Sequence, residues 1–311
     1  RFANRDRESS MPASLRQFVF HRSPGPKLLI TGGVHGDEFE PIAAIRRLIS
    51  LFETDAEEVA GFQGEVIFVP IVNEPAFLRG HRCAEDGLDL ARTCPGNPDG
   101  SITEQTAAAL SELIESADFY VDLHTGGTEY SVTPLAGYTL HRDAQVLEIQ
   151  RRMGKSFNLP VVWGTAGDLD GRSLSVARDS GIPAIYCEYL GSATCSDSGV
   201  KDYVQGCLNV MSELGFLERE LPPSRIDHVI EDPAPGSGHM QVCNPSPVTG
   251  FFEPVVKVGQ ILSAGDCLGT VFAMDDHAPH EIRSPHGGIV ITLRTFSRVR
   301  EDESVGVVAE L

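Results

Sequence analysis

The sequence lacks any apolar run that approaches the ~20 residues a membrane-spanning helix needs. Residues Arg1–Ser10 are charged and polar, and no apolar segment typical of a secretory signal follows them. The seven cysteines are scattered without a C-x-x-C pair, which argues against a disulfide framework and against a cysteine-type zinc site. Together these absences predict a soluble protein of the reducing cytoplasm.

Positive charge is also scarce. Lysine and arginine number 25 against 44 acidic residues, so the formal net charge is -19. Such a charge repels phosphate backbones and anionic lipid surfaces, and we therefore expect neither nucleic acid nor membrane as a partner. A small molecule is the remaining partner class, and the composition leaves homo-oligomer formation open.

The length of 311 residues predicts one large domain and one small one, because single cores stop growing near ~250–300 residues. From Lys27 to about Leu217, apolar β-branched runs alternate with amphipathic helical stretches. This alternation predicts a mixed α/β domain over residues 1–220, with a mainly parallel sheet flanked by helices. The expected strands are Leu28–Thr31, Val66–Val72, Phe119–Leu123, Val161–Trp163 and Ala184–Tyr189.

A proline-rich stretch over residues 218–238 indicates an interdomain connection, and residues 236–311 are predicted to be all β. This tail matches itself at an offset of 37 residues, for example at Gly250 with Gly287 and Gly269 with Gly306. The half-repeat predicts a small barrel-sandwich-like domain and resembles the biotinyl and lipoyl carrier domains. Asp275 stands where those carriers have their modified lysine, so we expect a structural cap without the carrier function.

The segment from Thr31 to Glu38 follows a short apolar strand and precedes a helix expected from about Pro41. His35 and Glu38 lie three residues apart at this turn, where an imidazole and a carboxylate can converge on one ion. The H-x-x-E pattern alone is a weak signal, because ordinary helices contain it by chance.

A second apolar strand ends in a histidine, His124, that is followed by glycines. Two strand-end histidines and one glutamate make a three-ligand set with a fourth position open for water. Asp122 lies on the same strand face as His124 and could accept a hydrogen bond from it, although a strand-end aspartate satisfied by backbone amides is equally consistent.

Four motifs occur in a fixed order: G-G-V-H-G-D-E-F-E-P, then N-E-P-A-F with D-L-A-R, then D-L-H-T-G, then E-Y-L-G. In these motifs the chain resembles the succinylglutamate desuccinylase/aspartoacylase family of zinc carboxypeptidase-like hydrolases, roughly over residues 26–215. The resemblance implies one zinc ion per chain on His35, Glu38 and His124, with Glu188 as the catalytic glutamate. Glu188 also stands at the exit of a strand that looks buried. Desolvation at this position would raise its pKa toward that of a general base.

The loop that begins at Asn73 concentrates arginines in an acidic protein, which suits a carboxylate clamp. By resemblance, Arg82 would polarise the scissile carbonyl and Arg92 would bind the substrate carboxylate. The family usually has D-L-N-R where this chain has Ala91 in place of the asparagine, which puts the usual acyl-glutamate and acyl-aspartate substrates in doubt. Asn73 and Arg178 are further substrate-binding candidates.

We therefore expect a zinc-dependent amidohydrolase that acts on a small N-acyl amino acid. Two alternatives stay open at this point. One is a metallocarboxypeptidase acting on peptides with the same zinc ligands. The other is a non-catalytic metal- or ligand-binding homologue, which the intact set of His35, Glu38, His124 and Glu188 disfavours.

Overall fold

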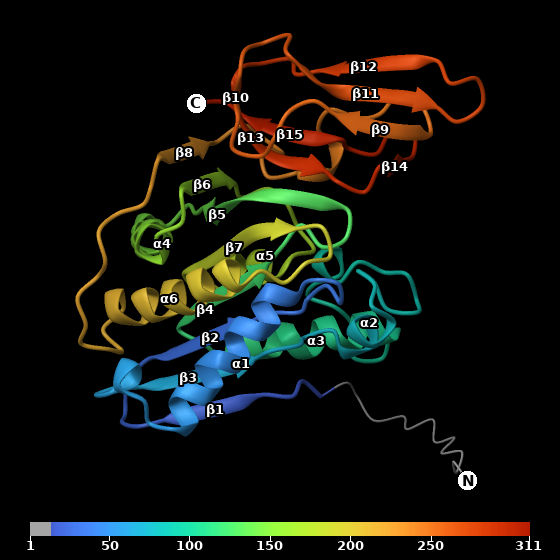
Figure 1. The fold of residues 1–311 in the computed structure, drawn as a ribbon. Helices are drawn as coiled ribbons and strands as arrows, with labels where there is room; N and C mark the ends of the chain where they lie inside the picture. The colour runs from blue at the N-terminus through green and yellow to red at the C-terminus, as the bar shows by residue number, and fades with distance from the viewer. Residues whose placement is uncertain (1–13) are drawn as a thin grey trace.

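The computed structural model describes residues 14–311. The polar segment Arg1–Ser10, in which no secretory signal is expected, lies outside the described residues. The ribbon places the α/β part below and the C-terminal β part above it (Figure 1). No helix within residues 14–311 has the length and apolar composition required to cross a membrane.

The centre of the α/β part is a mixed, mainly parallel sheet, as the sequence predicts. Its parallel neighbours are β3, β2, β4 and β7, in that order. The parallel strands are almost wholly buried because helices cover both faces of the sheet, which explains their continuous apolar runs. The bounds of these strands are Glu65–Val69 for β3, Lys27–Thr31 for β2, Phe119–His124 for β4 and Ala184–Gly191 for β7. The expected strand from Val66 thus ends at Val69, just before Pro70.

Three further strands of this sheet were not expected from the sequence. β1 (Phe18–His21) pairs antiparallel with β3 at one edge, and β5 (Tyr130–Leu140) pairs antiparallel with β7. β8 (His228–Asp232) lies inside the expected interdomain connection and runs parallel to β6 (Val161–Ala166), which itself pairs with β5. The connection therefore contributes a strand to the main sheet.

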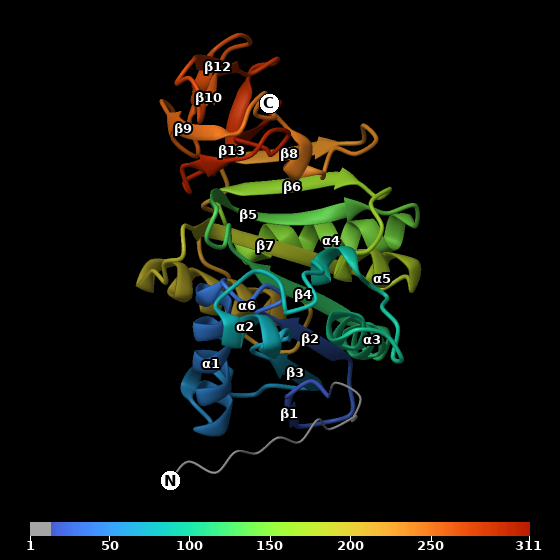
Figure 2. The ribbon, with the colours of Figure 1, turned by 90° about the vertical axis from the view of Figure 1, so that its right-hand side faces the viewer.

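Helices cover both faces of the sheet (Figures 1 and 2). α1 (Phe39–Glu53), α4 (Ala144–Phe157) and α6 (Asp197–Glu213) lie on one face, whereas α3 (Ile102–Glu115) and α5 (Ser173–Asp179) lie on the other. The short helix α2 (Glu74–Arg79) follows β3. The capping box expected at the start of α3 is present between Ser101 and Glu104.

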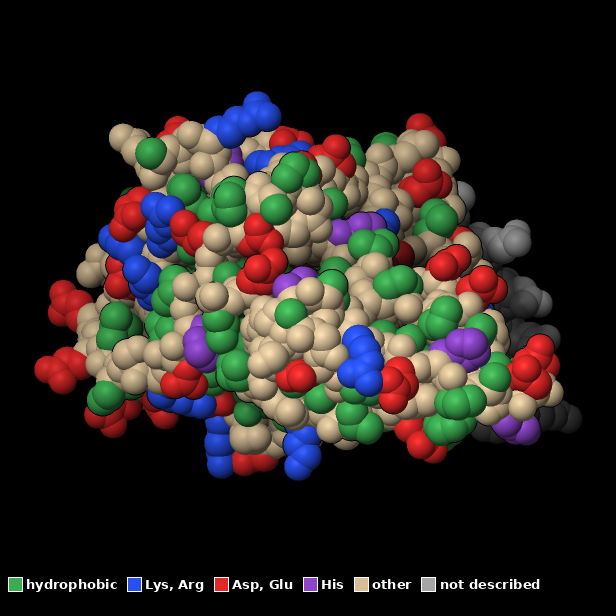
Figure 3. Space-filling model, turned by 90° about the horizontal axis from the view of Figure 1, so that it is seen from above, with side chains coloured by type: hydrophobic (Ala, Val, Ile, Leu, Met, Phe, Trp, Pro, Cys, Tyr) green, Lys and Arg blue, Asp and Glu red, His purple; other side chains and the backbone are tan. Residues whose placement is uncertain are grey.

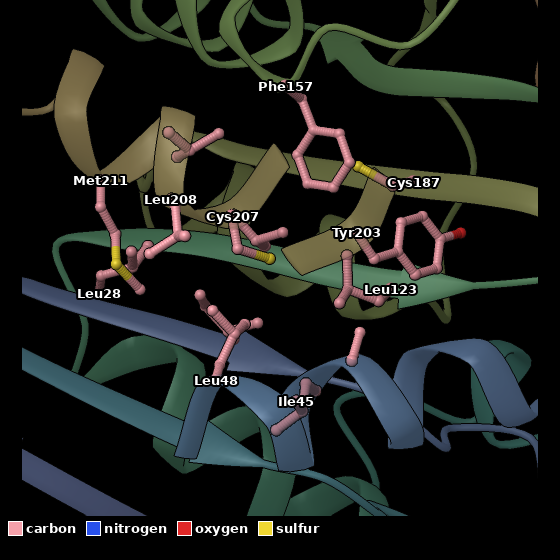
Figure 4. Close-up of a cluster of buried hydrophobic side chains, with 14 of the residues drawn as sticks. Leu28, Ile45, Leu48, Leu123, Phe157, Cys187, Tyr203, Cys207, Leu208 and Met211 are labelled. Carbon is pink, nitrogen blue, oxygen red and sulfur yellow. The ribbon is translucent and has the colours of Figure 1, made fainter. Parts of the chain in front are cut away.

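The larger core cluster fills the space between the sheet and the first of these helix layers. Ile45 and Leu48 of α1 lie below Leu208 and Met211 of α6, and Leu28 of β2 lies beside Met211 (Figure 4). All five side chains are buried, and each contributes about 1.5–3 kcal/mol relative to exposure. This packing fixes the sheet whose strand ends form the site.

The C-terminal part contains the two expected half-repeats. β10 (Ile261–Leu262) and β14 (Arg298–Val299) stand at equivalent positions of the repeat, as do β11 (Cys267–Ala273) and β15 (Gly306–Ala309). β9 (Gly250–Pro254), β11, β12 (Pro279–Arg283) and β14 form a separate antiparallel sheet. Asp275 is exposed in the turn between β11 and β12.

The C-terminal part is also joined to the main sheet, because β13 (Gly288–Arg294) pairs with the first residues of β5. Thr292 lies opposite Val132 in this register. Viewed from the C-terminal side, acidic and basic side chains are interspersed over the surface, and hydrophobic side chains form small separate groups (Figure 3).

Candidate active site

The three candidate metal ligands converge at the carboxyl ends of β2 and β4. His35 and Glu38 lie in the loop between β2 and α1, and His124 is the last residue of β4. Because β2 and β4 are parallel neighbours, their carboxyl ends lie side by side. Donor atoms of the three residues lie within 4.8 Å of one another, and all three side chains are buried.

Both histidines turn their Nδ1 atoms toward the glutamate. Nδ1 of His35 lies 2.6 Å from Oε1 of Glu38, and Nδ1 of His124 lies 3.2 Å from Oε2. The loop reaches this arrangement through a close approach at Gly36, where a Cβ atom would overlap the backbone at Ala76. Glycine is therefore required at position 36, as the tight turn in the sequence indicates.

Each histidine has a carboxylate behind its other ring nitrogen. Nε2 of His35 lies 3.1 Å from Oδ1 of Asp89, and Nε2 of His124 lies 3.0 Å from Oδ2 of Asp122. A carboxylate in this position fixes the tautomer and the ring orientation of a metal-binding histidine. The contact of Asp122 was anticipated from the sequence, whereas the contact of Asp89 with His35 was missed.

Asp122 is itself held by two hydroxyl groups. Thr31 Oγ1 donates to Oδ1 at 2.7 Å, and Ser173 Oγ donates to Oδ2 at 2.5 Å. Burial alone would raise the pKa of Asp122, but His124 and these donors outweigh burial and lower it. The aspartate is therefore ionised and can orient His124.

The electrostatics of the cluster favour a bound cation. Burial alone would raise the pKa of Glu38, but His35 and His124 outweigh it and hold the pKa well below the ordinary value. Burial alone would lower the pKa of His124, but Asp122 and Glu38 raise it. Two imidazole nitrogens and one carboxylate oxygen, supported by two further carboxylates, are compatible with zinc, which takes these donors in hydrolytic sites.

Glu188 lies beside this cluster. It stands opposite His124 in the register between β4 and β7, and it is 9% exposed. Burial, reinforced by Glu38 and opposed by His124, raises the pKa of Glu188 to about 8. Its Oε2 atom has no hydrogen-bond partner among the described residues. A carboxylate with a raised pKa and an unused oxygen suits a proton carrier.

Arg82 approaches the cluster from the loop after α2. Its Nε and Nη2 atoms donate to Oδ2 of Asp89 at 3.2 and 3.0 Å, and Nη1 lies 3.9 Å from Oε1 of Glu38. Asp89 thus bridges Arg82 and His35. Burial alone would lower the pKa of Arg82, but Asp89 and Glu38 raise it, so the guanidinium remains charged.

A cleft of about 590 Å³ contains the cluster, and Arg92 and Arg172 also line it. The part of the cleft around these two arginines is called the arginine end below. Neither arginine forms an ion pair with a carboxylate among residues 14–311, although Nη2 of Arg92 donates to Gln241 at 2.5 Å. Burial and the charge of Arg172 lower the pKa of Arg92 to about 10. Two cations without a carboxylate partner, in a protein of net charge -19, are suited chemically to an anion.

Two of the expected substrate-binding residues do not line the cleft. Arg178 does not line the cleft, since its guanidinium pairs with Asp170 and Asp179, each at 2.7 Å. Asn73 is fully buried, and its Oδ1 accepts the Ala76 N–H at the start of α2. Arg172, which precedes α5, lines the cleft in place of Arg178, which lies near the far end of that helix.

The C-terminal part supplies one wall of the cleft. The contributing residues come from the 3-10 helix η3 (Met240–Val242), from β13 and from the segment after β13. Among them are Met240, Gln241, Thr292 and Phe296. The C-terminal part therefore bounds the cleft on one side.

Comparison with known proteins places this geometry in a family. Residues 24–214 match the model of the succinylglutamate desuccinylase/aspartoacylase catalytic domain. N-alpha-acetyl-L-2,4-diaminobutyric acid deacetylase of Halomonas elongata is 31% identical over 299 residues, which cover 94% of this chain and 84% of that protein.

Two solved structures are similar over 95% of the chain. One is the product-bound ectoine utilization protein EutE (DoeB) of Ruegeria pomeroyi, with a TM-score of 0.84, 27% identity and 88% of that chain covered. The other is a succinylglutamate desuccinylase/aspartoacylase from Rhodobacter sphaeroides, with a TM-score of 0.83, 28% identity and 89% coverage. With the matched catalytic domain and the shared fold, the chain belongs to the succinylglutamate desuccinylase/aspartoacylase family.

Proposed function

We propose that the chain is a zinc-dependent amidohydrolase that removes the acyl group from a small N-acyl amino acid. The observation that carries the proposal is the convergence of His35, Glu38 and His124, with a carboxylate behind each histidine, in a cleft that also contains Glu188. When bound to these three residues, zinc would supply a Lewis acid and lower the pKa of a water molecule.

The chain's own residues supply the proton transfers. Glu188 takes a proton from the attacking water as the water oxygen adds to the amide carbon. As the carbon–nitrogen bond breaks, Glu188 returns the proton to the leaving amine, so the products are a carboxylate and a free amino acid. Arg82 stabilises the oxyanion. Its Nε and Nη2 atoms are bound to Asp89, so its Nη1 atom is the one that can donate to the negatively charged oxygen.

Arg92 and Arg172 determine which substrate amide is positioned near Glu188 for hydrolysis. A free carboxylate on the substrate would pair with Arg92 and Arg172 while the amide lies near Glu188. A long peptide would have to pass the wall formed by the C-terminal part, which disfavours the carboxypeptidase alternative.

Among N-acyl amino acids, we propose Nα-acetyl-L-2,4-diaminobutyrate as the first substrate to test. By its name, the Halomonas elongata relative acts on this compound, and the likeness covers 94% of this chain. The change of the family's D-L-N-R motif to D-L-A-R also argues against the acyl-aspartate and acyl-glutamate substrates.

The test combines metal content with turnover. We expect one zinc ion per chain by elemental analysis, its loss in His35→Ala and His124→Ala, and release of acetate from Nα-acetyl-L-2,4-diaminobutyrate by the zinc-loaded protein. A panel of N-acetyl and N-succinyl amino acids and short peptides serves as the comparison. Full zinc content in either variant, or preferential cleavage of the peptides, would refute the proposal.

A further inference from the structure

Tyr186 is a cleft residue that the proposed reaction does not use. It lies on β7 two residues before Glu188, so both side chains project from the same face of the strand. Both line the cleft, and Arg172 lines it beside them. The tyrosine therefore lies in the cleft with the proposed proton carrier and with one of the two arginines.

A close packing contact fixes the Tyr186 ring. Gly137 of β5 is its partner in the antiparallel register, and a Cβ atom added at Gly137 would overlap the ring carbons and the hydroxyl oxygen of Tyr186. The hydroxyl-bearing end of the ring thus packs against Gly137. A glycine opposite an aromatic residue gives the phenol one defined position, as a binding group requires.

The Tyr186 hydroxyl differs from most other tyrosine hydroxyls of the chain. Four of the six tyrosines place their hydroxyl against a protein group, namely Tyr120 on Thr31, Tyr130 on Ser304, Tyr138 on Glu231 and Tyr203 on the His124 carbonyl. The Tyr186 hydroxyl has no such partner within residues 14–311, although the side chain is only partly exposed. A half-buried phenol normally finds a partner, so this one is available to a ligand.

The surroundings of Tyr186 keep it a hydrogen-bond donor. Burial and the charge of Glu188 raise the pKa of Tyr186, while Arg172 acts in the opposite direction. The phenol is therefore protonated at neutral pH. A protonated phenol beside a guanidinium offers two donors to a single carboxylate.

We infer that Tyr186 is a specificity-determining residue whose hydroxyl donates a hydrogen bond to the substrate carboxylate bound at Arg172. This inference rests on the proposed function for the identity of the substrate. It adds a neutral donor to the two cations and makes the site selective for a carboxylate over a carboxamide.

The test measures affinity, so that it does not depend on turnover. The Glu188→Gln protein, loaded with zinc, is titrated by calorimetry with Nα-acetyl-L-2,4-diaminobutyrate and with the corresponding carboxamide. Adding Tyr186→Phe retains the ring on Gly137 and removes only the hydroxyl. We expect the affinity for the carboxylate to fall about 10- to 100-fold, the range for a hydrogen bond to a charged group, and the affinity for the carboxamide to change little.

Tyr138→Phe in the same background is the matched control. Its hydroxyl donates to Glu231 outside the cleft, so the affinity for the carboxylate should stay unchanged. Equal affinities with and without the Tyr186 hydroxyl, or equal losses on both ligands, would overturn the inference. If the parent protein hydrolyses no N-acyl amino acid but the affinity still depends on Tyr186, the proposed function fails and the inference stands.

Discussion

The two ends of the cleft differ in how their charges are balanced. At the metal end, Asp89 and Asp122 each contact a histidine, and Arg82 is paired with Asp89. At the other end, Arg92 and Arg172 have no carboxylate partner among the described residues. Protein groups therefore balance the charges at the metal end, whereas the charges of Arg92 and Arg172 suit an anionic ligand.

The largest effect expected from this comparison concerns Glu188, which lies at the metal end yet has an oxygen without a partner. Glu188→Gln should lower kcat by about 10²–10⁴-fold, the usual range for a general acid/base. Zinc content and melting temperature should remain those of the parent, because Glu188 is not in the ligand set. Near-parental turnover would make Glu188 a structural residue.

A smaller effect is expected at the arginine end. Arg172→Ala should lower kcat/KM for a substrate with a free carboxylate by about 10- to 150-fold, and Arg92→Ala by less, because Arg92 is the more exposed of the two. Arg178→Ala is the matched control, since Arg178 pairs with Asp170 and Asp179 outside the cleft. A loss in the Arg178 variant as large as that at Arg172 would contradict this assignment.

The third prediction concerns the support of the metal ligands. Asp122→Asn keeps the size of the side chain but removes the charge behind His124, and zinc affinity should fall about 10- to 100-fold. Competition with a chelating dye measures the affinity. For the zinc-saturated variant, KM should change little, because the arginine end is untouched. Unchanged zinc affinity would show that His124 is oriented without Asp122.

Much of the fold could be predicted because the central strands are continuous apolar runs that end in turns. β5 was not predicted because its sequence contains Pro134 and Gly137, which normally argue against a strand. Pro134 lies where the pairing of β5 with β7 is irregular, between Val132 and Leu135. β8 was not predicted because prolines surround it. It pairs with β6, a strand that is distant from it in the sequence.

The candidate site was predictable where local motifs place the residues. His35 and Glu38 follow one strand and His124 ends another, and parallel strands bring their carboxyl ends together. Arg172 could not be distinguished from Arg178 in this way. Arg172 precedes the short helix α5, and Arg178 lies in its last turn. Only the packing of α5 against the sheet determines which end of the helix faces the cleft.

The pairing of β13 with β5 has a consequence for synthesis on the ribosome. The strands that position the metal end are complete by β7, long before β13 leaves the exit tunnel. Until then the first residues of β5 expose an unpaired edge, and unpaired strand edges invite pairing with other chains. Nascent chains halted in this interval would present a nearly finished metal end together with an edge prone to aggregation.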